Sequence, residues 1–256
     1  MQRLAAALRA WTRQTKRPLP AAPPSAAVEK YLAGGRRPWS EGYWEYREQF
    51  TAAALADEAL MRHFRLGRDL PAGYGARLDE RVVEYPWVMS RLADRPGSIL
   101  DAGATLSYRY LLQRPALKKR QVVMCSLTLE SQQLPRPGVT YLLADLRYAP
   151  FRPANFDNIV CISTLEHIGL DSTQVYGAYG AGEHYREQQP ATFRLALQEF
   201  KRLLAPGGRL YLTVPFGQHQ QFGWLQQFDE ALLEQVKTAF AGQVEDLAFY
   251  RYSTAG

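Results

Sequence analysis

From residue 98 onward, short apolar runs alternate with longer amphipathic runs, and this alternation limits the possible folds more than any other feature. The short runs, such as "SILDA" and "DNIVCIS", are apolar at almost every position, which is typical of strands covered on both faces. Alternation of such strands with helices predicts an α/β fold with a doubly wound, mainly parallel sheet flanked by helices. We expect strands over residues 98–102, 121–126, 139–143, 157–163, 208–214 and 244–252, and helices over residues 106–113, 190–204 and 228–240.

The N-terminal part has a different organisation. Residues 1–37 contain eight Lys/Arg and one acidic residue, so they carry a net charge of +7 and leave −1 for the rest of a chain whose total is +6. Within them, residues 2–16 have the pattern of a basic amphipathic helix, suited to an anionic membrane surface or a partner, and a Pro-rich linker follows. The same residues also resemble a transit peptide, and the alternative to both is a solvated, partly disordered tail. Residues 38–97 are predicted to form a helical segment or cap, in which Pro86 should bend or split a helix.

Charge and composition exclude several classes of protein. Because the net positive charge is confined to residues 1–37, the body carries no excess of basic over acidic residues, so nucleic acid is disfavoured as a partner. No run approaches the length of a transmembrane helix, and the first 20 residues lack the apolar core of a signal peptide. Cys125 and Cys161 lie in apolar runs without metal-ligand spacing, so we expect no metal site, and we expect buried free thiols in a reducing, cytoplasmic compartment.

The ends of the predicted strands are the expected location of a ligand site. In doubly wound sheets, ligands bind beyond the carboxyl ends of the strands, where the strand order switches. The first strand ends at Asp101 and continues into a turn with a single glycine, Gly103. The second ends near Ser126, the third is followed by Asp145, and the fourth ends in "CISTLEHIGL". These residues should therefore lie along one edge of the sheet.

Three ordered stretches carry a family resemblance: "ILDAGATLS", "LADLRYAPFRPANFDNIVCISTLEHIGL" and "LQEFKRLLAPGGRLYLTVPFG". Together they resemble a class I S-adenosylmethionine-dependent methyltransferase (the methyltransferase type 11 kind) over roughly residues 78 to 225. The resemblance implies a Rossmann-like domain over residues 98–256, S-adenosyl-L-methionine as cofactor, and methyl transfer as the reaction.

The resemblance also implies roles for the strand-end residues. Asp101 would order the first turn beside the methionine part of the cofactor, and Gly103 would allow close approach of the backbone to the ligand. The amides of residues 104–107, at a helix N-terminus, would bind the cofactor carboxylate. Asp145 would accept a hydrogen bond from the adenine amino group, beside the amide and side chain of Leu146. The cofactor-binding candidates are Asp101, Ala102, Gly103, Ala104, Ser107, Ser126, Asp145, Leu146 and Ser163.

The catalytic candidates are His167, Glu166 and His184. The loop over residues 163–167 would border the sulfonium and the methyl acceptor. His167 has the intrinsic pKa of a proton acceptor for a hydroxyl, although it could equally be a packed or helix-capping histidine. Glu166 is expected to orient the loop or cap a turn. His184 lies in a glycine- and tyrosine-rich insertion that is either a lid above the site or an ordinary surface loop.

Ser126 stands where the family usually has an acid that binds the ribose hydroxyls. A serine hydroxyl lacks the charge of a carboxylate, so we expect cofactor binding about tenfold weaker than with an acid there. The leading hypothesis is methyl transfer to a small-molecule or glycan acceptor, at a hydroxyl oxygen. Three alternatives stay open: a non-catalytic methyltransferase-like binding or scaffold protein, an RNA methyltransferase that uses the basic tail, and a nucleotide-dependent oxidoreductase, which "DAGATLS" disfavours because it is not G-x-G-x-x-G.

The C-terminal end leads to one more expectation. After the predicted helix over residues 228–240, only one strand fits before the sequence stops. The sheet of the family closes with two strands. We therefore predict that the chain is truncated or that its final strand is missing.

Overall fold

The computed structural model describes residues 24–128, 134–173 and 186–252, so the predicted helix over residues 2–16 and the candidate His184 lie outside the described residues. The chain divides into two compact units, residues 1–47 and residues 48–256. In the first unit, helix α2 (Ala26–Ala33) follows Ser25, whose Oγ accepts a hydrogen bond from the Val28 amide. The sequence analysis predicted no helix in this stretch. Its N-cap serine is the local signal for one.

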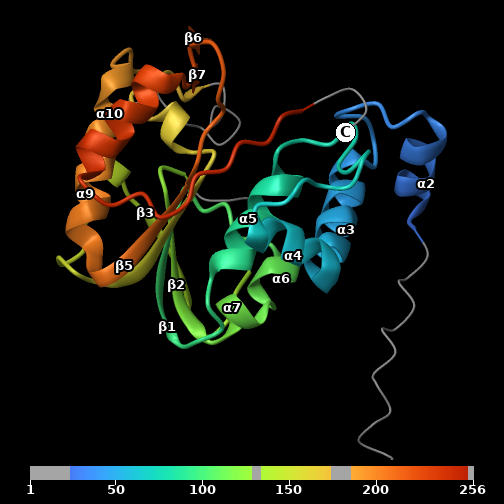
Figure 1. The fold of residues 1–256 in the computed structure, drawn as a ribbon, viewed down its shortest axis with the longest axis horizontal. Coiled ribbons are helices and arrows are strands. Elements are labelled where there is room, and N and C mark those ends of the chain that lie inside the picture. The colour runs from blue at the N-terminus through green and yellow to red at the C-terminus, as the bar shows by residue number, and fades with distance from the viewer. Residues whose placement is uncertain (1–23, 129–133, 174–185, 253–256) are drawn as a thin grey trace, which may run out of the picture. The chain divides into compact units, whose positions relative to one another are not determined.

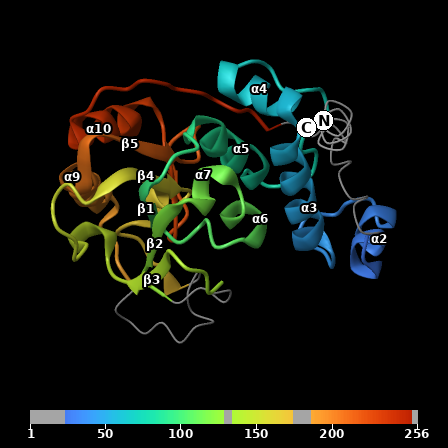
Figure 2. The same cartoon turned by 90° about the horizontal axis from the view of Figure 1, so that it is seen from below.

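The second unit is built on a five-stranded sheet whose neighbouring strands are all parallel (Figures 1 and 2). Its strands follow the order β3-β2-β1-β4-β5, so the strand order reverses between β1 and β4. This confirms the predicted doubly wound sheet. The strands are β1 (Gly97–Ala102), β2 (Arg120–Ser126), β3 (Val139–Leu143), β4 (Phe156–Ile162) and β5 (Leu204–Thr213), and a separate hairpin pairs β6 (Gln220–Gln221) with β7 (Gln226–Gln227).

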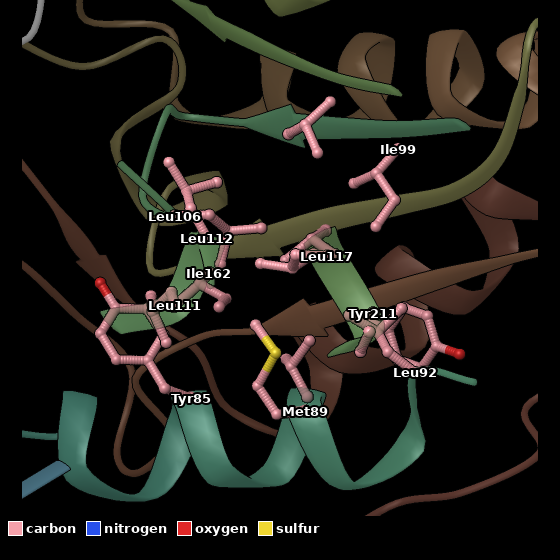
Figure 3. Close-up of a cluster of buried hydrophobic side chains, with 14 of the residues drawn as sticks. Tyr85, Met89, Leu92, Ile99, Leu106, Leu111, Leu112, Leu117, Ile162 and Tyr211 are labelled. Carbon is pink, nitrogen blue, oxygen red and sulfur yellow. The ribbon is translucent and has the colours of Figure 1, made fainter. Parts of the chain in front are cut away.

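Helices cover both faces of the sheet (Figure 1). Helices α5 (Arg81–Arg91), α6 (Arg109–Leu112) and α7 (Pro115–Lys118) lie on one face, and α9 (Phe193–Leu203) and α10 (Glu230–Phe240) lie on the other. Ile99 and Leu100 are consecutive, both fully buried, and belong to two different core clusters. This explains why β1 is apolar without alternation. Figure 3 shows the first cluster, in which Tyr85 and Met89 of α5 point toward the sheet.

The predicted helical segment before the sheet contains α3 (Tyr43–Ala56), α4 (Glu58–Leu66) and α5. We expected Pro86 to bend or split a helix, and the second of these alternatives was wrong, because α5 runs through Pro86. A proline has no N–H to donate to the carbonyl four residues earlier, which here is Val82. The Tyr74 hydroxyl donates a hydrogen bond of 2.6 Å to that carbonyl. The lost helical hydrogen bond is thus replaced by a tertiary one.

The predicted strand over residues 244–252 was also wrong, because the described residues 242–252 are extended but pair with no strand. Side chains hold the segment instead: Asp246 pairs with Arg91 of α5 at 2.5 Å, and Tyr250 packs against Phe64 of α4. Its valine and aromatic residues favour extended backbone, and this property alone misled the prediction. None of the helices in the described part of the chain has the length and apolar character needed to cross a membrane.

Candidate active site

The turn after β1 is organised by a buried carboxylate. Asp101 is fully buried and accepts hydrogen bonds from the amides of Thr105, at 3.1 Å, and Leu106, at 2.7 Å. The Thr105 hydroxyl donates a third, at 3.2 Å. From α5, the Tyr85 hydroxyl donates to the Thr105 carbonyl at 2.8 Å. Charge-assisted hydrogen bonds of this kind fix the path of the turn.

The expected helix N-terminus at residues 104–107 was wrong. Helix α6 begins only at Arg109, after Tyr108, whose backbone is extended. The amides of Thr105 and Leu106 are directed to Asp101, so they do not form a free set of donors for a ligand carboxylate. The Ser107 hydroxyl lies 2.9 Å from that of Tyr141 on β3. This turn is therefore shaped by an internal acid rather than by a helix terminus.

A glycine is needed at position 103 because the chain that follows β4 lies too close for a side chain there. Its φ is +110°, and a Cβ at this position would lie 2.1 Å from Oγ1 of Thr164, directly after β4. Its amide donates to the Cys125 carbonyl of β2 at 2.8 Å. The glycine thus lets the ends of β1, β2 and β4 converge, a close approach that a side chain would prevent. Ala102 and Ala104 flank it, and both are buried.

Ser126, at the end of β2, is buried and carries an unpaired hydroxyl. The residue is only 4% exposed, and its Oγ has no hydrogen-bond partner among the residues that the structure describes. Its carbonyl accepts a hydrogen bond from Ala144 at 3.0 Å, which places it beside the end of β3. Buried polar atoms without a partner are rare in folded proteins. Such an atom at this edge of the sheet suits a ligand that brings a hydroxyl group.

Asp145 follows β3 and starts the short helix η1 (Leu146–Tyr148). Its carboxylate accepts from the Arg147 amide at 2.8 Å and from the guanidinium of the same residue, the shortest contact being 2.6 Å. Arg147 also contacts Glu187, which the sequence analysis did not single out. The side chain of Asp145 keeps 29% of its surface exposed, whereas Leu146 is buried in the core beside α9.

The end of β4 is held by a carboxylate from α5 that the sequence analysis missed. Glu84 is buried, and its Oε1 accepts from the Ser163 hydroxyl at 2.6 Å and from the Thr213 hydroxyl of β5 at 2.5 Å. Its Oε2 pairs with Arg81 at 2.5 Å. Ser163 has a φ of +39°, an unusual conformation for a residue other than glycine. One signal was available: Glu84 is a charged residue within the apolar run "VVEYPWVM".

Glu166 lies in the loop after β4, and its side chain is buried. Its Oε2 has no hydrogen-bond partner in the described part of the chain. Burial, reinforced by the charge of Glu84 and opposed by Arg81, raises the pKa of Glu166 to about 8. The carboxyl is therefore largely protonated at pH 7. A buried acid with a strongly raised pKa at the end of a strand is typical of functional sites.

His167 lies next to it in η2 (Leu165–His167). Its Nδ1 is 2.9 Å from the carbonyl oxygen of Trp224, and its ring is stacked on the Trp224 ring. A carbonyl only accepts hydrogen bonds, so Nδ1 carries the proton and Nε2 presents a lone pair. Burial also lowers the pKa of His167, which keeps the ring neutral. Nε2 lies 3.9 Å from Oε1 of Glu166.

The predicted residues after β1, β2, β3 and β4 thus lie at one edge of the sheet, where the strand order reverses. Residues 116–212, which include β2 to β4 and most of β5, match a family model described as a methyltransferase domain. This part of the chain is similar to a methyltransferase domain. The parallel sheet, with the strand order reversed between β1 and β4, is the Rossmann-like sheet that the resemblance to class I enzymes implied.

Solved structures with a similar fold include three proteins whose sequences differ widely from this one. The 1,6-didemethyltoxoflavin-N1-methyltransferase of Burkholderia thailandensis, solved with 1,6-didemethyltoxoflavin and S-adenosylhomocysteine, is 19% identical (86% of this chain, 82% of that chain, TM-score 0.41). The YcgJ protein of Bacillus subtilis is 14% identical (61% and 67%, TM-score 0.42). The cyclase SpnF is 16% identical (77% and 71%, TM-score 0.41). No curated protein matches the sequence.

Two residues at this edge of the sheet have features that suit S-adenosylmethionine, the cofactor that the resemblance implied. Ser126 offers an unpaired buried hydroxyl, which can bond to a ribose hydroxyl. Asp145 is partly exposed and has acceptor capacity beyond its contacts with Arg147, which suits an amino group. The turn at Asp101 fits less well, because its own carboxylate occupies two of the amides expected to bind the ligand.

A first prediction concerns the unpaired hydroxyl of Ser126. Ser126→Ala removes a buried polar atom that has no partner in the described part of the free protein, so stability should be unchanged or slightly higher. Affinity for S-adenosylhomocysteine should fall about tenfold, because one hydrogen bond to the ligand is lost. Thermal unfolding and calorimetric titration measure the two effects. A variant that loses stability but binds normally would contradict this role.

Proposed function

We propose that the methyltransferase domain methylates a hydroxyl oxygen of a small-molecule or saccharide acceptor. The observation that carries the proposal is the state of His167, whose Nδ1 is committed to the Trp224 carbonyl and whose pKa is lowered by burial. A neutral ring with a free Nε2 lone pair is the form that accepts a proton from an attacking hydroxyl. An amine that attacks in its neutral form would have less need of such a base.

Glu166 supports this assignment because of its charge state. A negative carboxylate beside an imidazole stabilises the imidazolium and raises the histidine pKa. Burial instead keeps Glu166 largely protonated at neutral pH, so it adds little negative charge next to His167. Ser163, a cofactor-binding candidate in this loop, donates its hydroxyl to Glu84 and is better suited to shaping the loop than to binding the cofactor.

The cofactor supplies a methyl group that its sulfonium has already activated. The work left to the protein is to bind, to align the acceptor and to exclude water. We assign Ser126 to the ribose, Asp145 to the adenine amino group, and the Asp101 turn with Gly103 to the wall beside the methionine part. Ala102, Ala104, Ser107 and Leu146 would support this wall by packing.

Charge supports a small acceptor over a nucleic acid. The positive charge is concentrated in residues 1–37, and the rest of the chain is close to neutral. A nucleic-acid substrate would call for basic residues along the edge that carries the site. Cys125 and Cys161 are buried free thiols, and we propose a cytoplasmic location on that ground.

Two experiments test the proposal: the first measures binding of S-adenosylhomocysteine, and the second measures transfer of a labelled methyl group. S-adenosylhomocysteine should give measurable heat in calorimetric titration, and labelled methyl from S-adenosylmethionine should reach a hydroxyl compound in a panel of small molecules and saccharides. No binding at millimolar ligand would reject the enzyme and favour a non-catalytic scaffold. Methylation confined to amines or to RNA would reject the hydroxyl acceptor.

Once a methyl acceptor is identified, the His167→Asn variant tests whether His167 acts as the general base. Asparagine keeps a donor near Nδ1 for the Trp224 carbonyl but removes Nε2. We expect kcat to fall about 10²- to 10⁴-fold with unchanged affinity for S-adenosylhomocysteine. His219→Asn is the matched control, because His219 makes the same kind of Nδ1 contact, to the Gln227 carbonyl, at an exposed position. Equal kcat values for the two variants would contradict a base at His167.

A further inference from the structure

The Arg147 guanidinium is fully engaged between two carboxylates from distant parts of the chain. Its Nε and Nη2 donate to Asp145, with the Nη2 contact at 2.6 Å. Its Nη1 and Nη2 each donate to Glu187 at 2.6 Å, and Nη1 also reaches Thr192 Oγ1 at 3.4 Å. These contacts account for the five N–H donors of a guanidinium. The Arg147 side chain is 13% exposed, whereas the side chains of Asp145 and Glu187 are 29% and 27% exposed, so the guanidinium is more shielded from water than its two partners.

The contacts also limit what Asp145 can still bind. Its Oδ1 accepts from the backbone amide and Nε of Arg147, which fills both lone pairs of that oxygen. Its Oδ2 accepts from Nη2 and shares the Nε proton, so it retains capacity for about one more donor. A carboxylate held in this way presents a single acceptor in a fixed direction.

We infer that Arg147 is a positioning residue that makes Asp145 selective for a base with an exocyclic amino group, and that Glu187 is its second anchor. The inference rests on the proposed assignment of Asp145 to the adenine. Two features of Arg147 are needed: its positive charge, which pairs with the Asp145 carboxylate, and its planar fork, which fixes the carboxylate plane. A carboxylate oriented in this way accepts a hydrogen bond from an amino group and repels a carbonyl oxygen.

Base selectivity should also depend on Glu187, which lies 40 positions along the chain from Arg147. Without Glu187, the Nη1 and Nη2 donors directed toward it lose that acceptor, and the fork is held only by Asp145 and by the 3.4 Å contact of Nη1 with Thr192 Oγ1. With Glu187 in place, the guanidinium plane is held from both sides. We therefore expect changes at Glu187, which is not assigned to contact the cofactor, to reduce base selectivity.

The test compares two ligands that differ only at the base, S-adenosylhomocysteine and S-inosylhomocysteine, which carries a carbonyl oxygen in place of the amino group. Wild-type protein should prefer the adenine ligand by about tenfold or more, as expected for a hydrogen bond to a charged acceptor. Arg147→Lys keeps the charge but has only three donors and no planar fork. It should reduce the ratio of the two dissociation constants at least about threefold, chiefly by weakening the adenine ligand, and Glu187→Gln should reduce it by less.

Arg202→Lys is the matched control. Arg202 also forks onto a carboxylate, Glu199, and donates to the Ala149 and Phe151 carbonyls, so it fastens the same region to α9 without contacting Asp145. It should lower the thermal stability and leave the ratio unchanged. A reduced ratio in this control, or an unchanged ratio in Arg147→Lys, would overturn the inference.

Asp145→Asn separates failure of the inference from failure of the proposed function. An asparagine amide can donate to the inosine carbonyl, so the preference should disappear or reverse. If this variant changes the ratio and Arg147→Lys does not, Asp145 binds the base without the help of Arg147, and only the inference fails. If Asp145→Asn keeps the wild-type ratio, the adenine assignment and the inference fail together. Absence of binding by either ligand to wild-type protein would reject the proposed function itself.

Discussion

Glu166→Gln should make the protein more stable than wild type at pH 8, and this gain should shrink as the pH falls toward 5. The cause is the burial of a carboxyl whose pKa is raised to about 8, against 4.5 in the unfolded chain. Between these two values the folded state holds a proton that the unfolded state has released, so wild-type stability declines as pH rises. Each pH unit in this range lowers the free energy of unfolding by about 1.4 kcal/mol. The contribution of Glu166 to that free energy therefore falls by about 3 kcal/mol between pH 5.5 and 8.

Urea unfolding of both proteins at several pH values measures this difference. Glutamine resembles the protonated acid in shape and does not titrate, so the difference between the two curves isolates residue 166. The groups that face Glu166 and also influence it are Glu80, Arg81 and Glu84 from the region of α5, with Cys161 and His167 nearby. They are present in both proteins. Glu234→Gln, on the exposed surface of α10, should follow the wild-type curve. Parallel curves for wild type and Glu166→Gln would contradict the raised pKa.

The sheet was predictable from sequence because its strands are buried on both faces. β3 (Val139–Leu143) has the predicted bounds, and the bounds of β1, β2 and β4 shift by one residue at one or both ends. Burial leaves a continuous apolar run that local reasoning can find. The segment over residues 244–252 has similar composition but is held by Asp246 and Tyr250 side chains. Composition predicts extended backbone and does not predict a pairing partner.

The candidate site was predictable only in part, because its polar contacts are long-range. The strand ends point to Asp101, Ser126 and Asp145, since parallel strands end at the same edge. Glu84 reaches Ser163 across 79 positions, and Glu187 lies 40 positions from Arg147. No local pattern connects such residues. The amides of residues 104–107 were expected at a helix N-terminus, because no local pattern shows that Asp101 accepts from two amides of this turn.

Gly103→Val should abolish binding of S-adenosylhomocysteine and destabilise the domain. The sequence alone suggested that a side chain here would block the ligand. The structure adds a collision with Thr164, whose Oγ1 would lie 2.1 Å from the new Cβ and whose Cγ2 would lie 2.8 Å from it. The φ of +110° is also unfavourable for a β-branched residue. Strain and overpacking together should cost about 3 kcal/mol, measured by thermal and urea unfolding.

A second-site variant separates the two causes of the Gly103 effect. Gly103→Ala combined with Thr164→Gly removes every atom of the Thr164 side chain, including those nearest the added Cβ, and leaves only the strain of the positive φ. Stability should recover in part relative to Gly103→Ala alone, and binding should recover with it, because the ends of β1 and β4 can again approach. Recovery of stability without binding would mean that the ligand itself needs the space at Gly103. Wild-type affinity in Gly103→Val would show that this turn has no part in the cofactor site.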